Sequence, residues 1–296
     1  MFFRKQKEIK GHASGVYSCI AQPPFIYSGS GDKYVARWKI EEGIQDNFTI
    51  KFNDAVYCVE LAWETILIIG LSSGDLHFVD INERKELKYY TQHRSAIFGL
   101  HYNPSTGHLF VGDADGNLSV WDDNFNQIIY LPLGCGKIRS IRTDQTGERL
   151  LLGCQDGYVR LLDTNNFNEL VSINAHKGGC SSVLFEPFDV NQIITGGKDA
   201  RIKRWDLSNG QLLQNIPAHN YSVYDLVLLK NKKVLASASR DGSIKLWDIK
   251  GLNFIERLDK RVGGHKHSVN ALSVIDENTF VSCSDDKCLI IWEAIS

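Results

Sequence analysis

Proline and long apolar runs are scarce in this sequence, and each scarcity excludes a class of protein. Only 6 of the 296 residues are proline, against 25 glycines, a balance that favours many tight turns over long linkers. No apolar run approaches the ~18 residues that a membrane helix needs. The first residues, Met1–Lys5, lack the apolar core of a signal peptide. We therefore expect a cytoplasmic protein without a membrane partner.

A charge excess and paired cysteine motifs are absent as well. The 33 Lys and Arg residues nearly balance the 35 Asp and Glu residues, for a net charge of −2, so bulk electrostatics do not favour nucleic acid as a partner. The 7 cysteines are odd in number and include no C-x-x-C pair, so a zinc site has little support. We expect them to be small buried side chains in a reducing compartment, and we expect neither a metal nor a cofactor.

What the chain does contain is a repeat, best seen at Ala218–Asp248. An apolar run, Val223–Leu229, is followed by a Lys/Asn turn at 230–233 and a second run, Val234–Ser239. An Arg-Asp-Gly turn then leads to the alternating run Ile244–Trp247. Short runs with period-2 alternation between turns predict antiparallel strands. Such a meander cannot bury both faces alone, so we expect copies of it.

Seven copies are recognised by a turn residue, usually Asp, and a large apolar residue six positions later. The pairs are Asp32/Trp38, Ser73/Val79, Asp115/Trp121, Asp156/Leu162, Asp199/Trp205, Asp241/Trp247 and Asp286/Trp292. Successive pairs lie 41 to 45 residues apart. Five copies also have a His 20 to 23 residues before the Asp, at His12, His93, His176, His219 and His265. A period of ~40–45 residues with Gly-His and Trp-Asp signatures is typical of four-stranded propeller blades.

The chain closely resembles the WD-repeat family over its whole length. Its signature occurs literally at Gly11-His12, Trp121-Asp122, Trp205-Asp206, Trp247-Asp248 and Gly264-His265. The resemblance implies an all-β, seven-bladed β-propeller of four-stranded antiparallel blades, in one domain spanning residues 1–296. Phe2–Ile9 has no partner in its own repeat, and the chain stops soon after Trp292. We therefore expect this N-terminal strand to complete blade seven and close the ring.

The resemblance also implies a buried hydrogen-bond relay in which Asp accepts from His, His contacts Ser or Thr, and that hydroxyl contacts Trp. Four complete sets are expected: His12, Ser28, Asp32, Trp38; His176, Thr195, Asp199, Trp205; His219, Ser237, Asp241, Trp247; and His265, Ser282, Asp286, Trp292. Blade three has His93, Asp115 and Trp121 but Val111 at the hydroxyl position. A Ser/His/Asp group can be catalytic. Because it recurs in four blades, we interpret it as structural.

Partner contacts in this family often fall at fixed positions around the mouth of the central channel. Carried over to this chain, the positions selected for partner binding are Tyr17, Tyr57, Phe98, Lys137, Arg139, Lys198, Tyr224 and Arg240. Aromatic and Arg side chains are common interface anchors, and cations suit carboxylates or phosphate. The alternative is that the four aromatic side chains only plug the channel mouth.

These observations predict a non-catalytic scaffold that binds a protein or peptide, with an acidic or phosphorylated segment as the expected chemistry. The protein would be monomeric alone or a subunit of a complex. One alternative is an obligate subunit such as a ubiquitin-ligase substrate receptor, because Asp241–Lys250 faintly resembles the box that some receptors use. A second is an enzyme with a site in the channel. A large exposed apolar patch would favour the subunit, and convergent ionisable groups would favour the enzyme.

Overall fold

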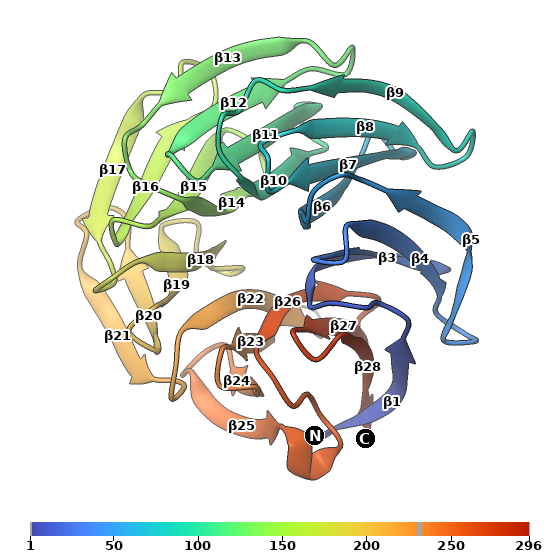
Figure 1. Cartoon of the computed structure of the whole chain (residues 1–296). Coiled ribbons are helices and arrows are strands. Elements are labelled where there is room, and N and C mark those ends of the chain that lie inside the picture. The colour runs from blue at the N-terminus through green and yellow to red at the C-terminus, as the bar shows by residue number, and fades with distance from the viewer. Residues whose placement is uncertain (1, 230–232, 296) are drawn as a thin grey trace. The chain divides into compact units, whose positions relative to one another are not determined.

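The computed structural model, drawn in Figure 1, describes residues 2–229 and 233–295. The chain divides into two compact units. Unit 1 comprises the residues up to Val59 and those from Ala218 onward, and unit 2 comprises Glu60–Pro217. The Lys/Asn turn expected at 230–233 lies largely outside the described residues. The expectation of a single domain over 1–296 stays a prediction.

Unit 1 contains three four-stranded antiparallel sheets. Each sheet corresponds to one blade predicted from the repeat. Blade one consists of β2 (Val16–Gln22), β3 (Phe25–Ser30), β4 (Tyr34–Lys39) and β5 (Ile44–Lys51). Blade six consists of β22 (Val223–Leu229), β23 (Val234–Ser239), β24 (Ile244–Asp248) and β25 (Asn253–Leu258). Blade seven consists of β26 (Val269–Val274), β27 (Thr279–Ser284), β28 (Cys288–Ile295) and β1 (Phe2–Lys10). The N-terminal strand therefore completes blade seven, as expected, and Figure 1 shows β1 beside β28.

The remaining blades follow the same plan, and unit 2 holds them except for the start of β6. Blade two consists of β6 (Val56–Ala62), β7 (Ile66–Leu71), β8 (Leu76–Asp80) and β9 (Lys85–Tyr90). Blade three consists of β10 (Ile97–Asn103), β11 (His108–Asp113), β12 (Asn117–Trp121) and β13 (Gln127–Pro132). Blade four consists of β14 (Ile138–Thr143), β15 (Arg149–Cys154), β16 (Tyr158–Asp163) and β17 (Glu169–Asn174). Blade five consists of β18 (Cys180–Phe185), β19 (Gln192–Gly197), β20 (Arg201–Asp206) and β21 (Leu212–Pro217). The all-β, seven-bladed fold class is confirmed.

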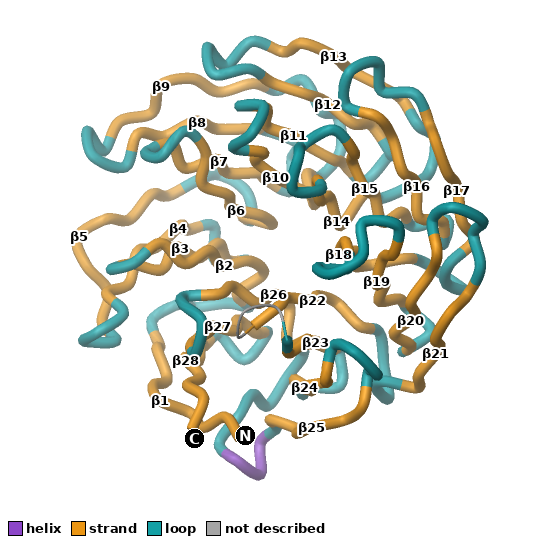
Figure 2. Tube along the Cα trace, turned by 180° about the vertical axis from the view of Figure 1, so that it is seen from behind, coloured by secondary structure: helices purple, strands orange, loops and turns teal. Residues whose placement is uncertain are grey.

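Helix is nearly absent from the described part of the chain. A single 3-10 turn, Lys260–Val262, lies between β25 and β26 and is the short helix in Figure 2. No helix among the described residues is long and apolar enough to span a bilayer. All seven cysteines are free and buried.

The hydrophobic core of each unit lies between neighbouring blades. In unit 1, Ile9, Val16 and Trp38 pack with Val281 and Ile291, which joins blade seven to blade one. This packing explains the sequence pattern, because a blade with neighbours on both faces needs apolar side chains on both. Accordingly, every residue of β7 and β23 is buried.

The residue after each turn Asp has a left-handed backbone, with φ of 95° at Gly157 and 77° at Gly242. Blade five has Ala200 at this position, with φ of 63°. Such a conformation is strained for a residue with a Cβ atom. The backbone at Ala200 is therefore strained in a way that a glycine at this position would relieve.

We expect Ala200→Gly to raise the free energy of unfolding by about 0.5 kcal/mol, since relief of the left-handed strain is partly offset by the greater chain entropy of unfolded glycine. Chemical denaturation measures the change. The matched control is Gly157→Ala, where the new Cβ would lie 2.2 Å from the His176 carbonyl oxygen, so stability should fall. A loss of stability in Ala200→Gly would contradict the strain argument.

Candidate functional site

Four blades contain a buried chain of side-chain hydrogen bonds with the composition expected from the repeat. In blade one, His12 Nδ1 lies 2.9 Å from an Asp32 carboxylate oxygen and His12 Nε2 lies 2.7 Å from Ser28 Oγ. Trp38 Nε1 donates to the same hydroxyl at 2.7 Å. The same contacts are made by His176, Thr195, Asp199 and Trp205, by His219, Ser237, Asp241 and Trp247, and by His265, Ser282, Asp286 and Trp292.

Donor and acceptor chemistry sets the direction of each chain. A carboxylate only accepts, so His Nδ1 carries the proton, and Nε2 accepts from the hydroxyl, which in turn accepts from the indole N–H. Burial lowers the pKa of His176 and His219 despite their Asp neighbours, which favours the neutral ring. Burial would raise the pKa of Asp286, but its contacts with His265 prevail and lower it to about 2. Each hydroxyl is buried and already committed, which favours a structural role over nucleophilic catalysis.

Blade three has a fifth relay whose members differ from those expected. His93 Nδ1 lies 2.8 Å from Asp113, not Asp115, and His93 Nε2 lies 2.8 Å from Ser119 Oγ, which also accepts from Trp121 Nε1. Ser119 pairs across the sheet with Val111, so the neighbouring strand supplies the missing hydroxyl. The choice of Asp115 was therefore wrong. The position of Ser119, two residues before the Trp, is the sequence signal that could have revealed it.

The same relay explains the Asp-rich turn of blade three. Asp113 is fully buried and accepts from the backbone N–H groups of Asp115 and Asn117 as well as the Asn117 amide. Its oxygens are thus occupied by protein donors. Among the described residues, no group of three or more His, Cys, Asp or Glu side chains could hold a metal ion.

Four of the eight side chains selected for partner binding, Tyr17, Phe98, Arg139 and Tyr224, lie at a kind of backbone irregularity that the sequence pattern does not indicate. In six blades, the pairing of the innermost two strands shifts register within the first three residues of the inner strand. The unpaired residues at these bulges are Tyr17, Phe98, Arg139, Ser181, Tyr224 and Asn270. A bulge leaves one residue outside the ladder and re-aims its side chain, a common device at binding sites.

In unit 2, the structure brings together a cluster that we call the basic cluster: Phe98, Lys137, Arg139 and Lys198. The Lys137 ammonium lies 3.5 Å from the centroid of the Phe98 ring, a cation–π contact. Burial and then the charges of Arg139 and Lys198 lower the pKa of Lys137, so both of these cations lie close enough to Lys137 to act on it. Among the described residues, neither Lys137 nor Lys198 forms an ion pair with a carboxylate.

In unit 1, the aromatic side chains divide into a pair and a separate residue. The rings of Tyr17 and Tyr57 meet edge to face with their centroids 5.4 Å apart. Tyr224 is half-buried at the bulge of blade six, and Arg240 is exposed at the turn of the same blade. Arg240 and Tyr224 therefore lie in a different unit from the basic cluster.

Two half-buried ionisable groups in unit 2 are not indicated by the sequence pattern. Burial raises the pKa of Glu60 to about 7, and burial with the Arg142 charge lowers the pKa of His101 to about 3. Glu60 accepts from the Leu61 N–H, and His101 Nε2 accepts from the Thr143 N–H at 3.1 Å. The bond from Thr143 joins the inner strand β10 to β14, whereas Glu60 bonds only to the next residue of its own strand. No sequence motif marks them, because each lies at a single position of an inner strand and not in a repeated pattern.

Comparison with known proteins gives a family to this architecture. The family model described as "WD domain, G-beta repeat" matches five segments that together cover more than half of the chain: residues 3–39, 84–122, 167–206, 210–248 and 257–293. The unmatched segments are those of blades two and four, in which Val79 and Leu162 replace the Trp. The first match contains β1 and the first three strands of blade one, so a sequence repeat spans two blades.

Individual relatives are distant and mostly much longer than the matched segment. A periodic tryptophan protein 1 homolog from Drosophila melanogaster is 31% identical over 177 residues, covering 57% of this chain and 38% of the relative. The human kinesin-like protein KIF21A is 23% identical over 96% of this chain but only 18% of its own length. WD repeat-containing protein 55 from Arabidopsis thaliana is 24% identical over 76% of this chain and 64% of its length. With its five matched repeats and seven four-stranded blades, this chain belongs to the WD40-repeat family.

Proposed function

We propose that this chain is a non-catalytic scaffold that binds a protein partner, and that the basic cluster receives an acidic or phosphorylated segment of that partner. The observation that carries the proposal is the cluster itself. Three cations lie close enough to depress the pKa of Lys137, and Phe98 provides an apolar surface beside them. A carboxylate or phosphate would relieve the repulsion between the cations, and an apolar neighbour in the ligand would pack on the ring.

The comparisons support the scaffold role at a coarser level. A similar segment occupies 18% of a kinesin-like protein, 32% of a striatin homolog and 38% of a U3 small nucleolar RNA-associated protein 15 homolog. The whole proteins differ widely by name, so the shared segment acts as a module within them. One relative is named for its association with a small nucleolar RNA. A cytoplasmic location for this chain is therefore still only a proposal.

A larger assembly is the second candidate, favoured by apolar side chains on the outer strands of unit 2. Tyr89, Ile128 and Leu170 are each about half exposed or more, on β9, β13 and β17. These strands are blade edges, where apolar side chains invite contact with another chain. Analytical ultracentrifugation of the purified protein alone and with its captured partner distinguishes a free scaffold from an obligate subunit.

The direct test is capture of partners from native lysate by wild-type protein and by the variants Arg139→Glu and Phe98→Ala, which each change one member of the basic cluster. Lys85→Glu is the matched charge-reversal control, because Lys85 is exposed on β9. We expect each test variant to lose roughly thirtyfold in affinity, the ~2 kcal/mol typical of a central anchor. The Arg139→Glu variant should also show slower association and a weaker dependence on salt.

Two further measurements, a phosphatase treatment and a comparison of melting temperatures, are needed to interpret the capture result. Phosphatase treatment of the lysate should abolish capture if phosphate is recognised and leave it intact if carboxylates suffice. Melting temperatures should match that of the wild type, since Arg139 and Phe98 are only half-buried. Undiminished binding by both folded variants would contradict the proposed site.

A further inference from the structure

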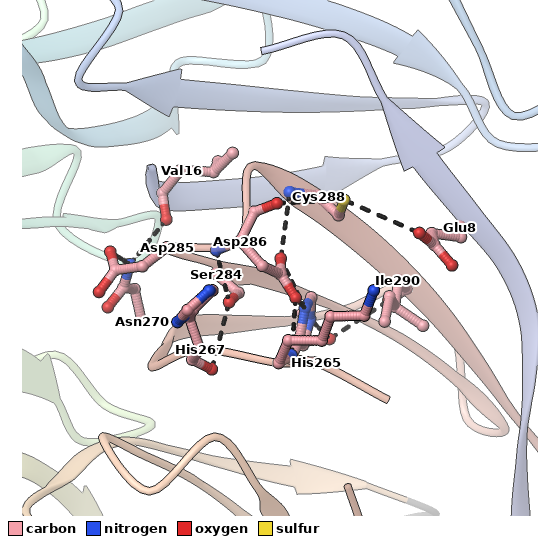
Figure 3. A network of polar contacts seen from close by, with 12 residues as sticks. Glu8, Val16, His265, His267, Asn270, Ser284, Asp285, Asp286, Cys288 and Ile290 are labelled. Carbon is pink, nitrogen blue, oxygen red and sulfur yellow. Dashed lines mark hydrogen bonds and ion pairs between the residues drawn. The ribbon is translucent and has the colours of Figure 1, made fainter. Parts of the chain in front are cut away.

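A carboxylate in unit 1 is held in place by a buried amide and is not used by the relay beside it. Asp285 lies in the turn between β27 and β28, directly before the relay residue Asp286. Asn270, which is only 9% exposed, donates from Nδ2 to Asp285 Oδ1 at 2.8 Å and to the Val16 carbonyl oxygen at 2.9 Å (Figure 3). The amide thereby ties the exposed carboxylate of blade seven to blade one.

Aromatic surface adjoins this carboxylate. A Cβ atom placed on Gly15 would lie 3.0 Å from Asp285 Oδ1 and 3.4 Å from the Tyr17 ring, and one on Gly31 would lie 2.9 Å from the Tyr17 hydroxyl oxygen. The Tyr17 ring therefore rests on glycine backbone, with Tyr57 against it. Burial, then the Asp285 charge and then Tyr57 raise the pKa of Tyr17, which indicates that the carboxylate and the phenol are close.

The negative charge of this group is not balanced within the protein. Asp286 accepts from His265 and from the backbone of Lys266, whereas within residues 2–229 and 233–295 no Lys, Arg or His forms an ion pair with Asp285. Asn270 occupies one lone pair of Oδ1 only, and a carboxylate offers about four acceptor positions. The remaining positions stay available to a ligand that donates hydrogen bonds.

We propose that Asp285, Asn270, Tyr17 and Tyr57 form a binding site for an arginine side chain of a partner protein. A guanidinium group donates two parallel hydrogen bonds to a carboxylate and stacks on aromatic rings, so it satisfies both halves of the site. A divalent cation is disfavoured, because a single carboxylate is available and, among the described residues, no group of three or more His, Cys, Asp or Glu side chains could hold a metal ion. The site goes beyond the basic cluster of unit 2, whose charge is opposite, and stands without it.

The test uses N-acetyl-arginine amide as the probe, with the uncharged isostere N-acetyl-citrulline amide as the matched control. Both are titrated to millimolar concentration into the full-length protein while backbone amide NMR signals are followed. We expect the arginine probe, and not citrulline, to shift the signals of Gly15, Asn270 and Asp285. The corresponding lysine amide tests whether a point charge suffices, and we expect weaker binding, because an ammonium cannot form the paired bonds.

Variants locate the site. Asp285→Asn removes the charge while keeping the shape, and we expect it to weaken binding of the arginine probe at least about tenfold, the loss typical of one interface contact. Asp115→Asn, an equal change at an exposed turn residue of blade three, should bind like the wild type. Arg139→Glu should also leave binding of the arginine probe unchanged. A failure of the proposed arginine site can therefore be distinguished from a failure of the proposal for the basic cluster.

Several results would overturn the proposal. These are shifts that citrulline reproduces, shifts that persist in Asp285→Asn, or no shifts around Asp285 at millimolar arginine probe. Because Asp285 is exposed, the variant is expected to fold, and its NMR spectrum reports this directly. Equal binding of arginine and lysine amides would contradict the paired geometry and reduce the site to a point-charge contact.

Discussion

Deletion of residues 2–9 is expected to leave a protein that is insoluble or melts at a much lower temperature. The strand β1 pairs with β28 from Phe2 to Lys10, and its loss would expose the edge of β28 along nearly its whole length. It would also remove Phe3 and Ile9, which are 5% and 0% exposed and belong to the two cores on either side of blade seven. Exposed edges promote association. Thermal unfolding and size-exclusion chromatography measure both consequences.

A pair of point variants separates the role of the strand from a general effect of truncation. Phe3→Ala removes a ring that meets Phe280 edge to face at 5.5 Å, and should cost about 3–5 kcal/mol of unfolding free energy. Phe2→Ala changes an adjacent ring that is 58% exposed and should cost less than about 0.5 kcal/mol. A truncated protein that stays monomeric and as stable as the wild type would show that β1 is dispensable.

The relay of blade six predicts a second large loss of stability. Asp241→Ala removes the acceptor that lies 3.1 Å from His219 Nδ1 and also accepts from the Asn220 N–H. The buried imidazole N–H would be left without its acceptor, at a cost of roughly 1–3 kcal/mol. Denaturant unfolding, with its slope checked for two-state behaviour, measures the difference.

Blade two supplies the matched control for this experiment. Ser73 stands where the other blades have Asp, and its hydroxyl donates to Asp75 at the exposed turn rather than to a His. Ser73→Ala should therefore change the unfolding free energy by less than about 0.5 kcal/mol. Equal destabilisation by the two alanine substitutions would contradict the claim that the relay stabilises blade six.

The fold was predictable because its signals are local and repeated. A turn residue followed by a large apolar residue six positions later marks every blade, even blades two and four, which lack the Trp. Repetition allowed the weak copies to be found from the strong ones. The strand expected at Phe2–Ile9 has no partner in its own repeat, and the repeat of blade seven lacks an outer strand. Assigning the first to the second therefore explains both observations.

In blade three, the residue that supplies the hydroxyl of the relay could not be predicted from local sequence spacing. In four relays the hydroxyl, the Asp and the Trp follow one spacing, but in blade three the hydroxyl comes from Ser119 on the strand opposite the expected position. Cross-strand neighbours occupy nearly the same space, so either can supply the group, and sequence spacing alone does not distinguish them.

The sequence by itself determined the number of blades, the strand pattern and the amino acids available at the inner-strand positions. The tertiary structure decided which of them act together. It placed Lys137 on the Phe98 ring, joined Tyr17 to Tyr57, and made Asn270 hold Asp285. The physical reason is that strand pairing follows from short-range periodicity, whereas these contacts join side chains on different blades or on separate strands. Their geometry depends on bulges and blade packing, which a linear pattern does not encode.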